Sequence, residues 1–210
     1  MRDYKLTIEY KSLKQNAPGG VYLVPSMEDL RTFYGFILVR KGPYQGAVFK
    51  FQLIVPPHYN GRKAWPQITF LTYVFNPFVD ATTWELDLQS AFPVWDPQKH
   101  YLVTVLTYLK KIFYTKDFST ATKAANPEAQ DLAINTPEVF RKKIQECVRQ
   151  STSDDILFDN LEGSTAVIKP DKSEYELFRN LLKTKIADAA AVSRDSVLKL
   201  VQEAAEQSKV

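Results

Sequence analysis

The clearest prediction of the fold comes from residues 42–55, GPYQGAVFKFQLIV. This stretch opens with a turn, because Gly-Pro and a second glycine interrupt regular structure, and it continues as a strand. Apolar residues take every second position from Phe49 to Val55, and Lys50 and Gln52 lie between them. This alternation is typical of an antiparallel strand that packs one face on a core.

Three more segments show a strand pattern between turn residues: 21–24, 32–39 and 67–74. Consecutive strands usually pair with one another, so these segments and residues 47–55 predict a four-stranded antiparallel meander. Residues 3–15 precede the strands and repeat apolar positions at i, i+4 and i+7. That spacing predicts a short amphipathic helix at the start of the domain.

The second half of the domain reads as helical. Residues 76–97 have no regular period and contain several prolines, which predicts a long loop. A strongly apolar helix follows at residues 101–113, and two more are expected after Asn126-Pro127. Thr136 before a proline is a good helix start, so we expect it to cap the last of them. Helices beside an antiparallel meander predict an α+β domain.

Composition excludes several classes of protein. The chain has 210 residues, of which 45% are hydrophobic and 24% charged, as in ordinary globular proteins. Its 27 basic and 24 acidic residues leave a net charge of +3, and the longest basic run is residues 141–143. That charge is too small and too scattered for a nucleic-acid partner. No apolar run reaches the length of a membrane span, so we expect no direct membrane insertion.

The sequence also suggests no metal or cofactor site. His58 and His100 are far apart in the chain, and only Asp96 lies one helical turn from either of them. The glycines form no phosphate-binding motif. Cys147 is the only cysteine and falls on an amphipathic helix, where a lone thiol is usually a packing residue. We therefore expect no cofactor and no metal.

The order of these elements resembles the fold of the ubiquitin-conjugating (E2) enzymes. The resemblance covers residues 3–150, and we assign residues 1–150 to this domain. The resemblance rests on five sequence motifs in the expected order: the hairpin at 42–50, the Pro-x-x-Tyr at 56–59, FNPFV at 75–79, WDP at 95–97, and Asn126-Pro127.

Three departures from the family pattern bear on activity. The family's catalytic cysteine lies ten residues after a motif histidine, and counting from Asn76, which replaces that histidine, gives Leu86. Leucine cannot form the thioester through which ubiquitin is passed on. Phe78 stands where the family has an asparagine thought to stabilise an oxyanion. The resemblance therefore implies a conjugating fold without the enzyme.

Further short sequence segments resemble those of one group of inactive variants, the fused-toes (AKT-interacting protein) and crossbronx group. They are GVYLVPS at 20–26, FYGFI at 33–37, ELDL at 85–88 and AFPVW at 91–95. Members of this group are associated with Hook coiled-coil proteins and FHIP partners, which couple endosomal vesicles to dynein and microtubules. The resemblance thus implies a protein adaptor in the cytoplasm, associated with vesicles or microtubules through its partners.

Two other functions stay open at this point. The first is a ubiquitin E2 variant that assists an active conjugating enzyme or binds ubiquitin without a covalent bond. The second is a divergent enzyme that uses Cys147 as its nucleophile.

The candidate partner surfaces are two loop tryptophans and the C-terminal part of the chain. Trp65 and Trp84 lie in loops, where a large aromatic side chain is an interface candidate or pins its own loop. Residues 151–170 are polar and predict a linker, or a strip laid along the domain. Residues 171–210 predict a helical extension with one apolar stripe, which includes Phe178, Leu182, Ile186, Val197 and Val201. This stripe could dock on its own domain, on a partner's helices or on a membrane surface.

Overall fold

A computed structural model describes residues 4–26, 29–59, 61, 64–118, 124–157 and 183–184 of the chain. The chain divides into two units, residues 1–169 and 170–210. Only residues 183–184 of the second unit are described, and they are helical. The predicted stripe of the extension, Phe178, Leu182, Ile186, Val197 and Val201, therefore lies outside the described residues.

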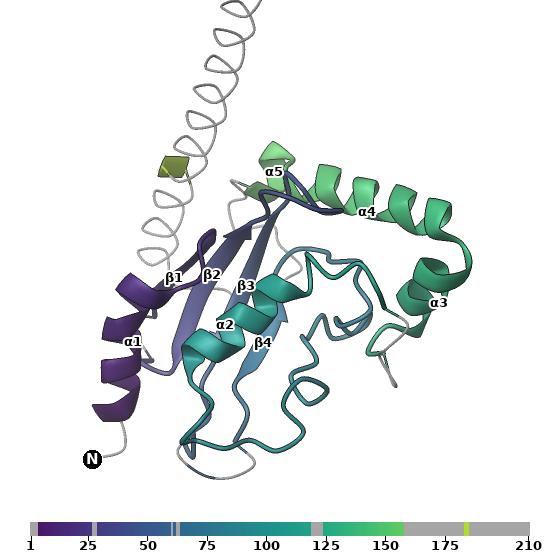
Figure 1. Cartoon of the computed structure of the whole chain (residues 1–210). Helices are drawn as coiled ribbons and strands as arrows, with labels where there is room; N and C mark the ends of the chain where they lie inside the picture. Colours follow the sequence, from purple (N-terminus) through teal and green to yellow (C-terminus); the bar gives the residue numbers. More distant parts are fainter. Residues whose placement is uncertain are drawn as a thin grey trace, which may run out of the picture. The chain divides into compact units, whose positions relative to one another are not determined.

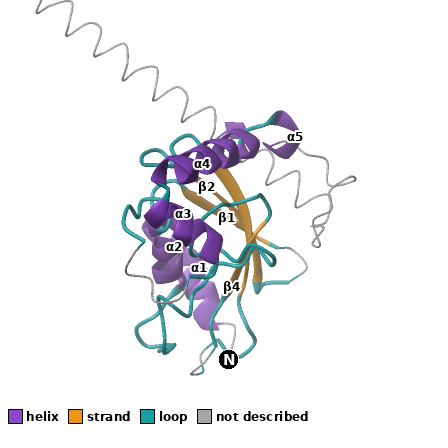
Figure 2. Ribbon diagram, turned by 90° about the vertical axis from the view of Figure 1, so that its right-hand side faces the viewer, coloured by secondary structure: helices purple, strands orange, loops and turns teal. Residues whose placement is uncertain are grey.

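The first unit contains the predicted meander (Figure 1). Its antiparallel strands pair in the order β1, β2, β3, β4. Their bounds are Val21–Pro25 for β1, Thr32–Leu38 for β2, Val48–Ile54 for β3 and Gln67–Phe70 for β4. In Figure 2 the helices α1, Tyr4–Asn16, and α2, Leu102–Lys111, lie on one side of this sheet. The α+β fold was predicted correctly.

Strand β4 is shorter than predicted, because the chain bends after Phe70 instead of continuing to residue 74. Beyond the bend a side chain replaces the ladder: the Thr72 hydroxyl accepts the N–H of Lys50 at 3.2 Å. The carbonyl of Lys50 accepts the N–H of Leu71 at 2.8 Å. The segment still follows β3, but without the regular alternation of a strand.

The core fills the space between the sheet and the two helices. Aromatic rings from two strands and from the segment after α2 meet at its centre, where Phe49 of β3 stacks on Phe113 with centroids 4.9 Å apart. Phe70 of β4 meets the same ring edge-on. All three side chains are buried. The alternation that predicted β3 thus reflects one face of a strand that packs against α2 and the residues after it.

A buried carboxylate joins α1 to the start of α2. Glu9 is 8% exposed, and its Oε2 accepts the N–H of Leu102 at 2.8 Å and the hydroxyl of Tyr59 at 3.0 Å. Leu102 is the first residue of α2, where free N–H groups and the helix dipole favour a negative charge. Burial and the neighbouring carboxylate raise the pKa of Tyr59, so its hydroxyl keeps the proton that it donates.

The last helices are α3, Pro127–Asn135, α4, Pro137–Ser151, and the single turn α5, Asp154–Leu157. Asn126 caps α3, since its Oδ1 accepts the N–H of Ala129 at 3.0 Å. Thr136 occupies the predicted position before α4, but its side chain makes no capping hydrogen bond. Thr136 also ends α3, its N–H bonded to the carbonyl of Leu132, so both helices constrain its backbone. Helix α5 falls within the segment expected to be a linker.

Replacing Glu9 with alanine should destabilise the domain, because the buried N–H of Leu102 would lose its acceptor and Tyr59 would lose its bond to the carboxylate. We expect a loss of about 2 kcal/mol in the free energy of unfolding. Chemical denaturation followed by tryptophan fluorescence would measure it. Glu138→Ala is the control, since its ion pair with Arg141 is exposed and should be worth little. Equal midpoints for the two variants would contradict a stabilising role for Glu9.

Candidate functional site

Asn76 is the most constrained polar residue of the predicted site. It is fully buried, and its Nδ2 donates to the hydroxyl of Tyr44 and to the carbonyl of Ile112, both at 3.1 Å. Its Oδ1 accepts the N–H of Phe78 at 3.0 Å. The Tyr44 hydroxyl in turn donates to the carbonyl of Phe75 at 2.6 Å. Asn76 therefore holds the loop in place, and its polar atoms are fully used in doing so.

Phe78 contributes packing to the site. Its ring lies 6.2 Å from that of Tyr108 and 5.9 Å from that of Phe118, measured between centroids. A phenyl ring carries no hydrogen-bond donor for a developing negative charge. The backbone of Phe78 pairs with the next stretch of the site, because its carbonyl accepts the N–H of Asp87 at 2.9 Å.

Leu86, the residue predicted to replace the catalytic cysteine, lies in a well-ordered backbone setting. Its N–H donates to the carbonyl of Ile68 at 2.9 Å, and it forms a bridge with Val79. The side chain is 5% exposed and belongs to the hydrophobic core cluster. This position thus holds a buried hydrocarbon side chain, whereas thioester chemistry needs an accessible thiolate.

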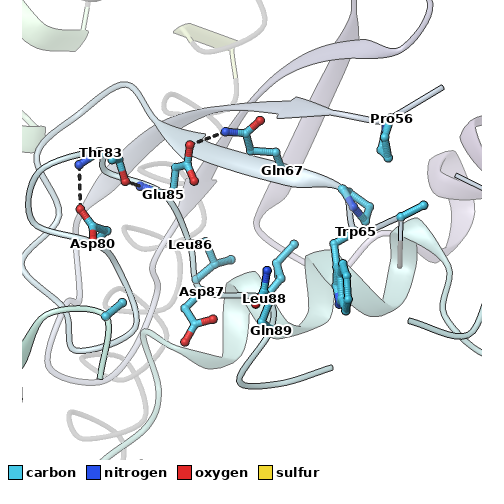
Figure 3. A pocket seen from close by; sticks show the side chains of 13 residues that line it. Pro56, Trp65, Gln67, Asp80, Thr83, Glu85, Leu86, Asp87, Leu88 and Gln89 are labelled. Atoms are coloured by element: carbon cyan, nitrogen blue, oxygen red, sulfur yellow. Dashed lines mark hydrogen bonds between the residues drawn. The ribbon is translucent and has the colours of Figure 1, made fainter. Parts of the chain in front are cut away.

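A pocket of about 560 Å³ lies beside Leu86 (Figure 3). Its lining contains three carboxylates, Asp80, Glu85 and Asp87, and no basic side chain among the described residues. Each carboxylate also serves its own loop. Glu85 accepts a hydrogen bond from Gln67, Asp87 accepts one from Ser90, and Asp80 accepts two backbone N–H groups. These backbone donors lower the pKa of Asp80, so the pocket is acidic at neutral pH.

These acidic residues were not among the predicted site residues, although the sequence carried a signal for two of them. Glu85 and Asp87 alternate with Leu86 and Leu88, which places polar and apolar side chains on opposite sides of an extended segment. The leucines are buried and the acids are half-buried, as this period implies, and all four residues line the pocket. Asp80 joins them only through the fold of the loop, which no local pattern reveals.

The two candidate tryptophans have different surroundings. The indole N–H of Trp65 donates to the carbonyl of Phe92 at 2.8 Å, and its ring packs against the core. Trp65 therefore pins its own loop and also lines the pocket. Trp84 is 37% exposed and has a φ of 60°, a left-handed conformation that a bulky residue rarely adopts.

The loop around Trp84 enforces that conformation. The N–H of Trp84 donates to the carbonyl of Asp80 at 3.0 Å, and the N–H of Asp80 donates to the carbonyl of Glu85 at 2.9 Å. The carbonyl of Trp84 accepts the N–H of Phe70 at 2.9 Å. Backbone bonds on both sides thus hold an exposed indole next to the acidic pocket.

Cys147 is a buried packing residue. Its thiol donates to the carbonyl of Tyr73 at 3.2 Å and accepts the N–H of Phe75 at 3.5 Å. Burial raises the pKa of Cys147 to about 11, far from that of an activated nucleophile.

The histidines form no metal site within the described residues. Nδ1 of His100 accepts the N–H of Asp96 at 3.0 Å, a bond within one turn. Within this part of the chain, no three His, Cys, Asp or Glu side chains gather where they could hold a metal ion. Nor does it include any helix with the length and apolar character needed to span a bilayer.

Comparison with known proteins shows which family this fold resembles. A family model described as ubiquitin-conjugating enzyme matches residues 5–148. The AKTIP homolog of Nematostella vectensis is 35% identical over 148 residues, covering 70% of this chain and 48% of the relative. The crossbronx homolog of Culex quinquefasciatus is 32% identical over 153 residues, with coverages of 72% and 66%. The AKT-interacting protein of Rattus norvegicus is 34% identical over 151 residues, with coverages of 72% and 50%.

A solved structure described as a novel ubiquitin-conjugating enzyme shares the fold, with a TM-score of 0.56 and 22% identity. The match covers 68% of this chain and 91% of that one. This chain spans about half to two thirds of the length of the relatives above. The resemblance expected from the motifs is confirmed: the chain belongs to the ubiquitin-conjugating enzyme family, and within it to the variants named AKT-interacting protein and crossbronx.

Proposed function

We propose that this protein is a conjugating-enzyme fold without conjugating activity, which acts as a protein adaptor. The observation that carries the proposal is the buried side chain of Leu86 at the position expected to hold the nucleophile. Phe78 adds no oxyanion donor, and Asn76 uses its amide to hold the loop. The chain keeps the fold of the family, while Phe78 and Leu86 at the described site contribute packing and no reactive group.

The partners we propose are Hook-like coiled-coil proteins and FHIP-like proteins. The relatives carry the name AKT-interacting protein, which says that those proteins bind a protein partner. Through such partners the chain would link endosomal vesicles to dynein and microtubules in the cytoplasm. We assign the contacts to the exposed indole of Trp84 and to the apolar stripe predicted at residues 171–210.

Ubiquitin charging tests the missing activity. With activating enzyme, ubiquitin and ATP, the wild-type chain should form no thiol-sensitive adduct, as judged on non-reducing gels. Leu86→Cys should also stay uncharged, because the new thiol would be buried and Phe78 offers no donor. An adduct on the wild type that disappears in Cys147→Ala would refute the proposal. An adduct on Leu86→Cys would show that the site keeps a working geometry.

Thiol reactivity tests Cys147 directly. A shift of its pKa from 9.0 to about 11 leaves about a hundredfold less thiolate near pH 8. Modification by a thiol reagent should be slower than in denaturant by at least that factor. The free energy of unfolding should fall between pH 9 and 11, because the unfolded thiol releases its proton first. Cys147→Ala should lack that part of the decline, and equal slopes in the two proteins would contradict the pKa shift.

Partner capture tests the adaptor function through Trp84→Gly in the full chain. Glycine removes the indole and suits a φ of 60°, so the melting temperature should be equal or higher. Hook-like and FHIP-like proteins recovered with the tagged protein should fall about tenfold or more, as for an interface hot spot. Quantitative mass spectrometry would measure them.

Tyr73→Ala is the matched control, because Tyr73 is an aromatic residue of similar exposure, 40%. Leu182→Asp with Ile186→Asp tests the predicted stripe of the extension in the same experiment. Wild-type protein that recovers active conjugating enzymes or ubiquitin chains in place of the trafficking proteins would favour the second candidate, an E2 variant that works within the ubiquitin pathway.

A further inference from the structure

The outer face of the sheet is buried, although it points away from the core. Strand residues alternate between faces, and the second face of β2 and β3 carries Tyr34, Phe36, Leu38, Val48, Lys50 and Gln52. None of them belongs to the hydrophobic core cluster. Phe36 is nevertheless 0% exposed, Gln52 3% and Lys50 7%. Another part of the same chain must therefore cover this face.

The end of α4 and the turn α5 reach this face. The N–H of Val48 donates to the hydroxyl of Ser151, the last residue of α4, at 3.2 Å. The ammonium group of Lys50 donates to the carbonyl of Ile156 in α5. The backbone of Lys50 lies opposite that of Phe36 in the register of β2 and β3. In Figure 2, α5 lies on the side of the sheet opposite α2.

The short strand β4 explains why Ser151 is needed there. Pairing between β3 and β4 begins at Phe51, which lies opposite Phe70, so Val48 and Lys50 precede the ladder. Buried backbone N–H groups need acceptors. Thr72 supplies one for Lys50, and Ser151 supplies one for Val48. The Ser151 hydroxyl also donates to the carbonyl of Val148, so it joins α4 to the open edge of β3.

The closed face carries two energetic costs. A buried ammonium group is expensive unless its donors are paired, and the carbonyl of Ile156 is an acceptor that Lys50 gains only when α5 is in place. Gln52 donates to the Tyr34 hydroxyl, but its Oε1 is buried with no hydrogen-bond partner among the described residues. Both groups would gain water if the cover left. Within the described residues, the bonds of Val48 to Ser151 and of Lys50 to Ile156 hold the cover, and these costs oppose it.

We infer that residues 151–157 form an intramolecular strap that closes the outer face of the sheet, with Lys50 as its latch. The part of the face that it contacts, at Val48 and Lys50, is then withheld from other proteins while the strap is in place. A protein that docks on this face must displace the strap first. The strap is a regulatory element on the side of the sheet opposite α2, and none of its residues lines the pocket beside Leu86.

Hydrogen exchange of the full chain tests the strap through Ile156→Asp. This change puts a charge on a half-buried residue of the strap itself, outside the sheet, so the domain should stay folded. We expect amide exchange in residues 151–157 to become on the order of tenfold faster, as for a local opening. A hydrophobic dye should bind more strongly, because the apolar surface around Val48, which is buried next to Ser151, becomes accessible. Gln145→Asp adds the same charge to an exposed position of α4 and should behave as the wild type.

Lys50 supplies the second test. Lys50→Met keeps the length of the side chain but removes its donors, and it should speed exchange of residues 151–157 in the same way. Lys50→Arg keeps hydrogen-bond donors, so residues 151–157 should exchange more slowly in this variant than in Lys50→Met and at about the rate of the wild type. Unchanged exchange and dye binding in Ile156→Asp would overturn the strap. Faster exchange in Lys50→Met that Lys50→Arg fails to slow would overturn the latch.

Discussion

The amide of Asn76 is the interaction on which the rest of the site depends. It is bonded to the Tyr44 hydroxyl in the turn before β3, to the carbonyl of Ile112 after α2, and to the N–H of Phe78 in its own loop. One buried side chain thus ties together three segments that are far apart in sequence. A buried amide that satisfies both of its ends gives a unique arrangement, because any shift leaves a polar atom unpaired.

That constraint holds the backbone of the site independently of the side chains of Phe78 and Leu86. The loop that follows Asn76 keeps its backbone pairing with residues 85–87, through the bridge between Val79 and Leu86. Phe78 packs against the core and Leu86 is buried within it. The geometry of the loop is maintained by amide and backbone bonds, which do not depend on the chemical nature of these two side chains.

The sequence predicted the parts of the fold that a periodic pattern specifies. The alternation around Phe49, the stripe of α1 and the apolar run of α2 all mark faces that meet one core.

The end of β4 at Phe70 and the uncapped Thr136 depend on neighbours that local patterns do not contain. The same holds for Asp80 in the pocket and for the left-handed Trp84, both set by a loop closed on itself. Residues 151–170 were expected to form a linker or a strip laid along the domain. Residues 154–157 form a turn of helix, and the carbonyl of Ile156 accepts a hydrogen bond from Lys50 of the sheet.

The bond between Val48 and Ser151 also bears on how the chain folds. It spans 103 residues, and it completes the edge of a strand that forms the centre of the sheet. A nascent chain has the whole meander long before residue 151 emerges, and until then the N–H of Val48 lacks the acceptor that Ser151 supplies. Long-range closure of this kind raises the contact order and slows folding. Until α4 arrives, the open edge of β3 is the place where a half-made domain would pair with another chain.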